Sequence, residues 1–160
     1  MEDQERFEKY LGNVYRYLGI RARSEKEIRD YLIKKKASDE IIEKMISLLY
    51  EQKFLNDEEF ARSWVRSRAR SRPKGKRLLQ IELAQKGIAK DVIEQVLSED
   101  QEDIPDELTQ AKNLIGKRVD RLRGEPRQVV YQKVGAFLGR RGFSWELAKK
   151  AIDQTLDQES

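Results

Sequence analysis

Apolar residues recur at three- and four-residue steps along most of this chain, a spacing that predicts amphipathic helices. A first helix is expected over 7–18, with Phe7, Leu11, Val14, Tyr15 and Leu18 on one face. Ser24 followed by Glu27 forms a capping-box pattern that predicts a helix start, and Ser38 is placed to cap the helix after it. No segment alternates as a strand would, so the fold class predicted is all-α.

One helix-pair pattern is written three times. Each copy has a leucine, then a basic residue three places on, then a position that is usually glycine, and an apolar pair that begins the next helix. The copies start at Leu32, Leu83 and Leu138, and the glycine position holds Lys36, Gly87 and Gly142. A left-handed helix end favours glycine, because a side chain there is strained.

The copies are about 51 and 55 residues apart, an interval typical of stacked repeats. We expect an elongated tandem array of three-helix repeats over 1–55, 56–104 and 105–160, acting as a monomer. The acidic stretch Ser98–Pro105 reads as a linker or as a loop packed on the surface.

Composition argues against an enzyme. The chain has no cysteine and no histidine, which are common nucleophiles, general bases and metal ligands. We therefore expect no catalytic residue, no metal and no cofactor. No apolar run is long enough to span a membrane, and the acidic start differs from a signal peptide, so a cytoplasmic protein is expected.

Positive charge is concentrated in one segment. From Arg62 to Lys86 there are nine basic residues and the single acid Glu82, a net charge of +8, while the remaining residues carry −4. The basic residues are Arg62, Arg66, Arg68, Arg70, Arg72, Lys74, Lys76, Arg77 and Lys86. On a helix, Arg62, Arg66 and Arg70 share one stripe, which we expect to face solvent opposite an apolar face.

Such a stripe suits a polyanion, since a guanidinium can bind a phosphate with two hydrogen bonds. The alternative is an ordinary solvated helix face, although a solvated helix usually alternates the sign of its charges. A second basic group comprises Lys117, Arg118, Arg121, Arg123 and Arg127, with Arg140 and Arg141 nearby in sequence. The aromatic residues Phe60, Trp64, Phe137 and Trp145 are expected in the core.

The central segment resembles the signature of the RecX family, bacterial regulators of the RecA recombinase. The resemblance rests on Phe54–Ala61, Lys74-Gly75 with Arg77-Leu78, Glu82-Leu83 and Lys86-Gly87-Ile88, with Arg23–Ile28 similar to the entry to the family's first conserved helix. It covers 21–97 well and the segment after Ala111 only by its repeat pattern.

The resemblance implies a protein without catalytic activity that binds the groove of the RecA filament on single-stranded DNA. It would impede strand exchange and the coupled ATPase, or alter filament growth and disassembly, in homologous recombination, DNA repair and the SOS response. The residues that would contact DNA or the filament are Arg62, Arg66, Arg68, Arg70, Arg72, Lys74, Lys76, Arg77, Lys86, Arg140 and Arg141. The alternatives are a generic helical nucleic-acid-binding module and a helical-repeat protein scaffold.

Overall fold

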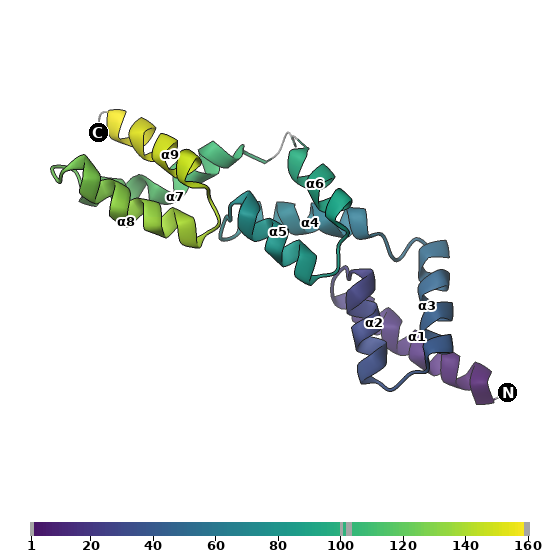
Figure 1. Cartoon of the computed structure of the whole chain (residues 1–160). Helices are drawn as coiled ribbons and strands as arrows, with labels where there is room; N and C mark the ends of the chain where they lie inside the picture. The colour runs from purple at the N-terminus through teal and green to yellow at the C-terminus, as the bar shows by residue number, and fades with distance from the viewer. Residues whose placement is uncertain (1, 100, 102–103, 159–160) are drawn as a thin grey trace. The chain divides into compact units, whose positions relative to one another are not determined.

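The chain folds into helices, as predicted. The computed structural model describes residues 2–99, 101 and 104–158, and within these it contains nine helices and no strand (Figure 1). The helices are α1 (Glu2–Ile20), α2 (Glu25–Lys34), α3 (Asp39–Glu51), α4 (Asp57–Arg70), α5 (Lys76–Gln85), α6 (Lys90–Ser98), α7 (Glu107–Arg121), α8 (Arg127–Arg140) and α9 (Trp145–Asp157).

Short polar side chains start several of these helices. The predicted capping box is confirmed: Ser24 Oγ accepts the Glu27 N–H at 3.2 Å, and the Glu27 carboxylate accepts the Ser24 N–H at 3.1 Å. Ser38 caps α3 as expected. Each cap satisfies a backbone N–H that has no partner inside its own helix.

The threefold sequence pattern becomes one repeated helix end. The N–H groups of Ala37, Ile88 and Phe143 donate to the carbonyls of Leu32, Leu83 and Leu138 at 3.0, 3.1 and 3.1 Å. The residue before each donor has a positive φ, which is 64° at Lys36, 80° at Gly87 and 90° at Gly142. This is the Schellman arrangement, so the prediction of left-handed helix ends is confirmed at the two glycines, and Lys36 adopts the same conformation.

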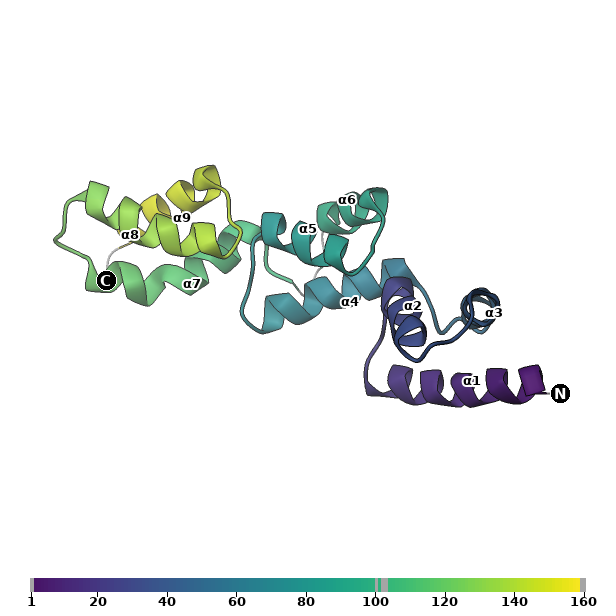
Figure 2. The ribbon, with the colours of Figure 1, turned by 60° about the horizontal axis from the view of Figure 1, so that its bottom comes forward.

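The described residues form two compact units. The first comprises the described residues up to Ser63 together with Leu83–Val96. In this unit α3 packs against α1 and α2, which Figure 2 shows in purple and blue. Its main core consists of Val14, Ile28, Leu32, Ile42, Met45, Ile46, Leu49 and Leu55.

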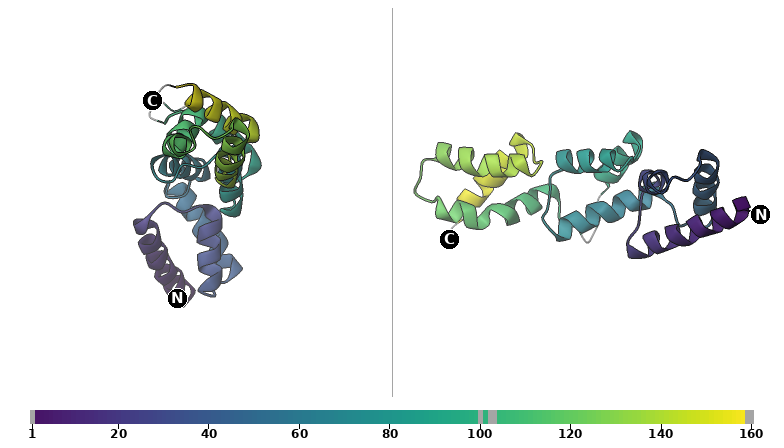
Figure 3. Two further views of the ribbon diagram at one scale, coloured as in Figure 1. Left: turned by 90° about the vertical axis from the view of Figure 1, so that its left-hand side faces the viewer. Right: turned by 90° about the horizontal axis from the view of Figure 1, so that it is seen from below.

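The second unit comprises Trp64–Glu82 and the described residues from Leu97 onward. Here α9 packs against both α7 and α8, as the right-hand view of Figure 3 shows. The core gathers mostly aliphatic side chains, and the largest fully buried one is Phe143. The other core residues are Ala111, Ile115, Val119, Val130, Val134, Phe137, Leu138, Ala148, Ala151 and Ile152.

One pair of hydrogen bonds joins neighbouring repeats, and it occurs twice. In the first unit, Ser24 Oγ donates to the Lys86 carbonyl at 2.7 Å, and the Glu25 N–H donates to the Asp57 carboxylate at 2.9 Å. Ser24 and Glu25 lie at the start of α2, and Asp57 is the first residue of α4. We call this contact the first joint.

The second unit has an equivalent pair at the start of α5, with a backbone N–H as donor where the first joint uses the Ser24 hydroxyl. The Gly75 N–H donates to the Arg141 carbonyl at 2.7 Å, and the Lys76 N–H donates to the Glu107 carboxylate at 2.7 Å. Glu107 is the first residue of α7, as Asp57 is of α4. We call this contact the second joint.

Three details differ from the expectations. Trp145 is 51% exposed, so its assignment to the core is wrong, and Trp64 is only half-buried; Phe60 and Phe137 are buried as expected. Helix α1 is longer than the predicted 7–18. Of the predicted linker, Ser98 ends α6, and residues 100, 102 and 103 lie outside the described residues.

Candidate nucleic-acid interface

The three arginines of the stripe on α4 differ in their surroundings. Arg62 pairs with Glu58 and, at 2.7 Å, with Glu59. Arg66 is half-buried with no described acid within salt-bridge distance, and Arg70 is exposed. The stripe lies opposite the buried Phe60 and Ala61, as expected, but it is only partly exposed, and its first arginine pairs with acids of the same helix.

The carboxylate of Glu82 in α5 accepts hydrogen bonds from three side chains. Arg68 donates to both of its carboxylate oxygens at 3.1 Å, Lys74 donates at 2.6 Å and the Trp64 indole donates at 2.9 Å. Burial by itself raises the pKa of Glu82, but the hydrogen bonds from Lys74, Trp64 and Arg68 outweigh it and hold the pKa below its usual value. Arg68 and Lys74 thus have a structural partner inside the chain.

The connection between α4 and α5 and the first turn of α5 carry exposed cations. Arg72 has a φ of 53° and is exposed, as are Lys76 and Arg77. No acidic side chain of the described residues forms a salt bridge with any of these three. Their charges therefore face solvent without an internal counter-ion.

The second joint brings distant cations beside this connection. A Cβ on Gly75 would lie 2.3 Å from the Gly142 carbonyl carbon, and a Cβ on Gly142 would lie 2.4 Å from Leu78 Cβ. Only glycines allow this approach, which places the segment 72–77 against the turn that carries Arg140 and Arg141. We call the six cations that these two adjoining segments carry the basic junction: Arg72, Lys74, Lys76, Arg77, Arg140 and Arg141.

Lys86 belongs to the first joint instead. Its ammonium lies 3.3 Å from Glu27, which also pairs with Arg21 at 2.5 Å. Burial raises the pKa of Glu27, yet its bonds from Arg21 and the Ser24 N–H, together with nearby Lys86, outweigh this effect and lower it. The structure gives Lys86 and Arg62 intramolecular roles in the first unit.

Two residues outside the predicted set lie beside the basic junction. The Arg118 guanidinium is 3.8 Å from the centre of the Phe137 ring, and the Arg141 guanidinium is 4.8 Å from it. Sequence reasoning placed Arg118 in a secondary basic group and Phe137 in the core. Aligning the second and third repeats would have identified them, because this alignment places Arg118 opposite Arg68 and Phe137 opposite Glu82.

The basic junction can bind an anion with repeated charge. Guanidinium and ammonium groups donate charge-assisted hydrogen bonds to phosphate, and arginine does so with two parallel bonds. Across residues 2–99, 101 and 104–158, no cluster of three or more acidic side chains is placed to hold a metal ion. In the same residues, no helix is long and apolar enough to cross a membrane.

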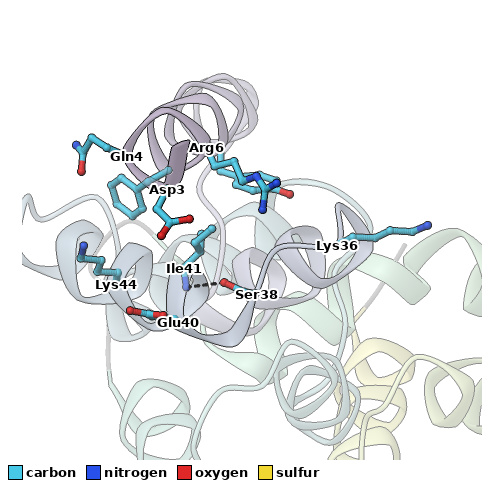
Figure 4. A pocket seen from close by; sticks show the side chains of 10 residues that line it. Asp3, Gln4, Arg6, Lys36, Ser38, Glu40, Ile41 and Lys44 are labelled. Atoms are coloured by element: carbon cyan, nitrogen blue, oxygen red, sulfur yellow. Dashed lines mark hydrogen bonds between the residues drawn. The ribbon is translucent and has the colours of Figure 1, made fainter. Parts of the chain in front are cut away.

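A pocket of about 500 Å³ lies in the first unit, beside α1 and the start of α3 (Figure 4). Its lining mixes charges of both signs: Asp3 and Glu40 are acidic, while Arg6, Lys36 and Lys44 are basic. No ligand charge is favoured by such a lining, so we assign the pocket no role.

Three family models match the chain in tandem. They describe the first, second and third three-helix domains of RecX, and they match residues 13–49, 56–97 and 105–152. A relative from Prosthecochloris aestuarii named Regulatory protein RecX is 36% identical over 148 residues, covering 92% of this chain and 94% of that protein. The chain belongs to the RecX family.

Other RecX relatives are longer. The Regulatory protein RecX of Bacillus pumilus is 36% identical over 141 residues, which cover 88% of this chain and 53% of that protein. One from Bacillus velezensis is 33% identical and matches over 55% of its length. The chain therefore spans about half the length of these relatives.

Solved RecX structures share the fold. The crystal structure of RecX from Lactobacillus salivarius superposes with a TM-score of 0.84 over 96% of this chain and 98% of that one, at 24% identity. A second crystal structure, of regulatory protein RecX, gives a TM-score of 0.76 at 27% identity, covering 92% of this chain and 71% of that one. The prediction of tandem three-helix RecX domains is confirmed.

Proposed function

We propose that this chain regulates RecA by binding the groove of the RecA filament on single-stranded DNA and inhibiting its ATPase and strand exchange. The observation that supports this most is the basic junction, where cations from two repeats meet without internal counter-ions for Arg72, Lys76, Arg77 and Arg140. A filament offers phosphates and protein surface together. A chain with three tandem domains has several surfaces for both.

The predicted contact residues differ in how readily they can reach a phosphate. Arg66, Arg72, Lys76, Arg77, Arg140 and Arg141 are the primary contacts, and Arg70 is included with them because it is exposed. Arg62, Arg68, Lys74 and Lys86 already pair with acids of this chain, so a phosphate must compete with those acids for them. Removing one of these four is expected to weaken DNA binding less.

The remaining parts of the proposal concern the molecule as a whole. It acts as a monomer in the cytoplasm, in recombination, DNA repair and the SOS response, and it needs no catalytic group or cofactor. Its repeats occupy 1–55, 56–104 and 105–160. The regulatory name of its relatives supports this role.

The test is a RecA ATPase and strand-exchange assay with substoichiometric amounts of the chain. We expect inhibition, and we expect Lys76→Gln, Arg77→Gln and Arg140→Gln together to reduce it strongly. The matched control changes the equally exposed Lys9, Lys34 and Lys90 to Gln, which removes the same charge elsewhere and should preserve inhibition. A chain that binds DNA without any effect on RecA is a generic nucleic-acid module. A triple variant with full inhibition indicates a scaffold.

A further inference from the structure

The second and third repeats align residue by residue through the joint contacts. Asp57 and Glu107 play the same part in the two joints and are 50 residues apart, the interval that also separates Arg68 from Arg118. For the second helix of each repeat, equivalent residues are 55 positions apart. Gly87 and Gly142 show this, because they end their helices with the same hydrogen bond. The same 55 residues separate Glu82 from Phe137.

This alignment exposes a difference in chemistry. In the second repeat, the Arg68 guanidinium makes two hydrogen bonds with the Glu82 carboxylate, both at 3.1 Å. In the third repeat, Arg118 stands where Arg68 does, but its partner is the ring of Phe137. At equivalent positions, the second repeat thus pairs its arginine with a carboxylate, and the third repeat pairs its arginine with an uncharged ring.

The third repeat also gathers a second arginine on that ring. Because both guanidinium carbons are measured from one ring centre, they are at most about 8.6 Å apart. A ring face attracts a cation, but it accepts none of the guanidinium's fork of hydrogen bonds. The guanidinium groups of Arg118 and Arg141 are thus held near each other, and the ring provides no acceptor for their N–H donors.

No acid of the described residues neutralises this pair. Neither Arg118 nor Arg141 has a salt bridge there, and α8 contains no acidic residue. On α7, Asp120 pairs with Arg123 at 3.0 Å, and the other charged neighbours of Arg118 are Lys117 and Arg121. The cations that converge at Glu27 and at Glu82, by contrast, share an internal carboxylate.

We propose that Arg118 and Arg141, held on Phe137, bind a backbone phosphate of single-stranded DNA, which takes the place that Glu82 fills in the second repeat. A phosphate can accept hydrogen bonds from two guanidinium forks at once. The neighbouring cations of the basic junction favour an anion that repeats along a polymer over a single carboxylate. The choice of polymer rests on the proposed function, whereas the anion site rests on the geometry alone.

The test measures anisotropy of a labelled oligo-dT with the full chain and its variants at low salt. We expect Arg118→Gln and Arg141→Gln each to weaken binding by about tenfold, because each removes a bidentate charged contact. Arg121→Gln, an exposed arginine of the same helix, is the matched control and should change affinity by less than about threefold. Circular dichroism checks that every variant is folded.

A second experiment exchanges the residue types at the equivalent positions 82 and 137, and it tests whether the missing carboxylate creates the anion site. Phe137→Glu supplies the internal carboxylate and should weaken binding as much as the Arg118→Gln, Arg141→Gln pair. Glu82→Phe releases Arg68 and Lys74 and should strengthen binding. Both variants should also shift the salt dependence of the affinity, by about 0.7 in log–log slope for each phosphate that the chain ceases or begins to bind.

Several outcomes overturn the proposal. They are an effect of Arg118→Gln no larger than that of Arg121→Gln, equal binding of an uncharged methylphosphonate oligomer, and no binding of oligo-dT by the unchanged chain. If the unchanged chain does not bind oligo-dT while Phe137→Glu abolishes RecA inhibition, the anion that Arg118 and Arg141 bind is a protein carboxylate. Because these measurements contain no RecA, a chain that passes them without affecting RecA contradicts the proposed function alone.

Discussion

Single residues explain why the three helix ends look alike. The left-handed conformation costs a residue with a side chain roughly 1–2 kcal/mol, and glycine avoids this cost. Two repeats use Gly87 and Gly142 for it, while the first uses Lys36 at a φ of 64°. The sequence already indicated that Lys36 occupies the position where the other two repeats have glycine, because the same leucine and apolar pair flank it.

Lys36→Gly should therefore stabilise the chain. Relief of the backbone strain exceeds the added flexibility of the unfolded chain, so we expect a gain of up to about 1 kcal/mol in the free energy of unfolding. Urea denaturation measures it. The opposite change, Gly87→Ala, should destabilise, because a Cβ there would lie 2.5 Å from the Lys26 side chain. Destabilisation by Lys36→Gly would contradict this account of the helix ends.

The two cation-binding carboxylates predict how stability depends on pH. The folded pKa values of Glu27 and Glu82 are below their usual values, so below about pH 4.3 the unfolded chain holds more protons at these sites than the folded chain. Their stabilisation is complete above that pH and is lost as the pH falls through the folded pKa values. Replacing both with Gln should lower stability near pH 7 by about 1–3 kcal/mol for each site.

Urea midpoints at pH 6 and pH 3 measure this effect. The decline between the two should be smaller in the Glu27→Gln, Glu82→Gln chain than in the unchanged chain. A variant with the exposed Glu40 and Glu94 changed to Gln controls for the removal of two charges. A full decline in the first variant would show that other groups govern acid unfolding.

At the scale of elements, helix types and caps followed from local sequence, while the contacts between repeats did not. Ser24 and Ser38 indicate where their helices start, because a cap acts within three residues. The joints link the Ser24 hydroxyl to the Lys86 carbonyl and the Gly75 N–H to the Arg141 carbonyl, across 62 and 66 residues. Both acceptors are backbone carbonyls, which every residue has, so only the register of the repeats could have suggested these partners.

The second joint gives an element-scale prediction. Gly75→Ala should lower stability by about 1–3 kcal/mol, because the new methyl group would lie 2.3 Å from the backbone of Gly142. Gly139→Ala is the matched control: it lies in α8 with no atom within 4 Å of the added Cβ, so better helix propensity should stabilise by up to about 1 kcal/mol. Equal effects of the two substitutions on the urea midpoint would mean that the second joint contributes little.

At the scale of the molecule, sequence located the excess of positive charge but not its internal neutralisation. The run from Arg62 to Lys86 reads as nine cations facing one acid. In the fold, Glu58, Glu59 and Glu27 reach Arg62 and Lys86 from outside that run. Counting charges along the chain cannot show such pairs, because they depend on helix geometry and on tertiary contacts. Within this run, Arg66, Arg72, Lys76 and Arg77 form no salt bridge with an acid of the described residues.

The measurement that tests the central claim most directly compares the chain's affinity for a RecA filament with its affinity for the same naked single strand. A filament regulator contacts both phosphates and repeated protein surface, so its affinity for the filament should be at least about tenfold higher, a difference of about 1.4 kcal/mol. Equal affinities, with RecA ATPase unchanged, would contradict the regulator and leave a general nucleic-acid-binding module.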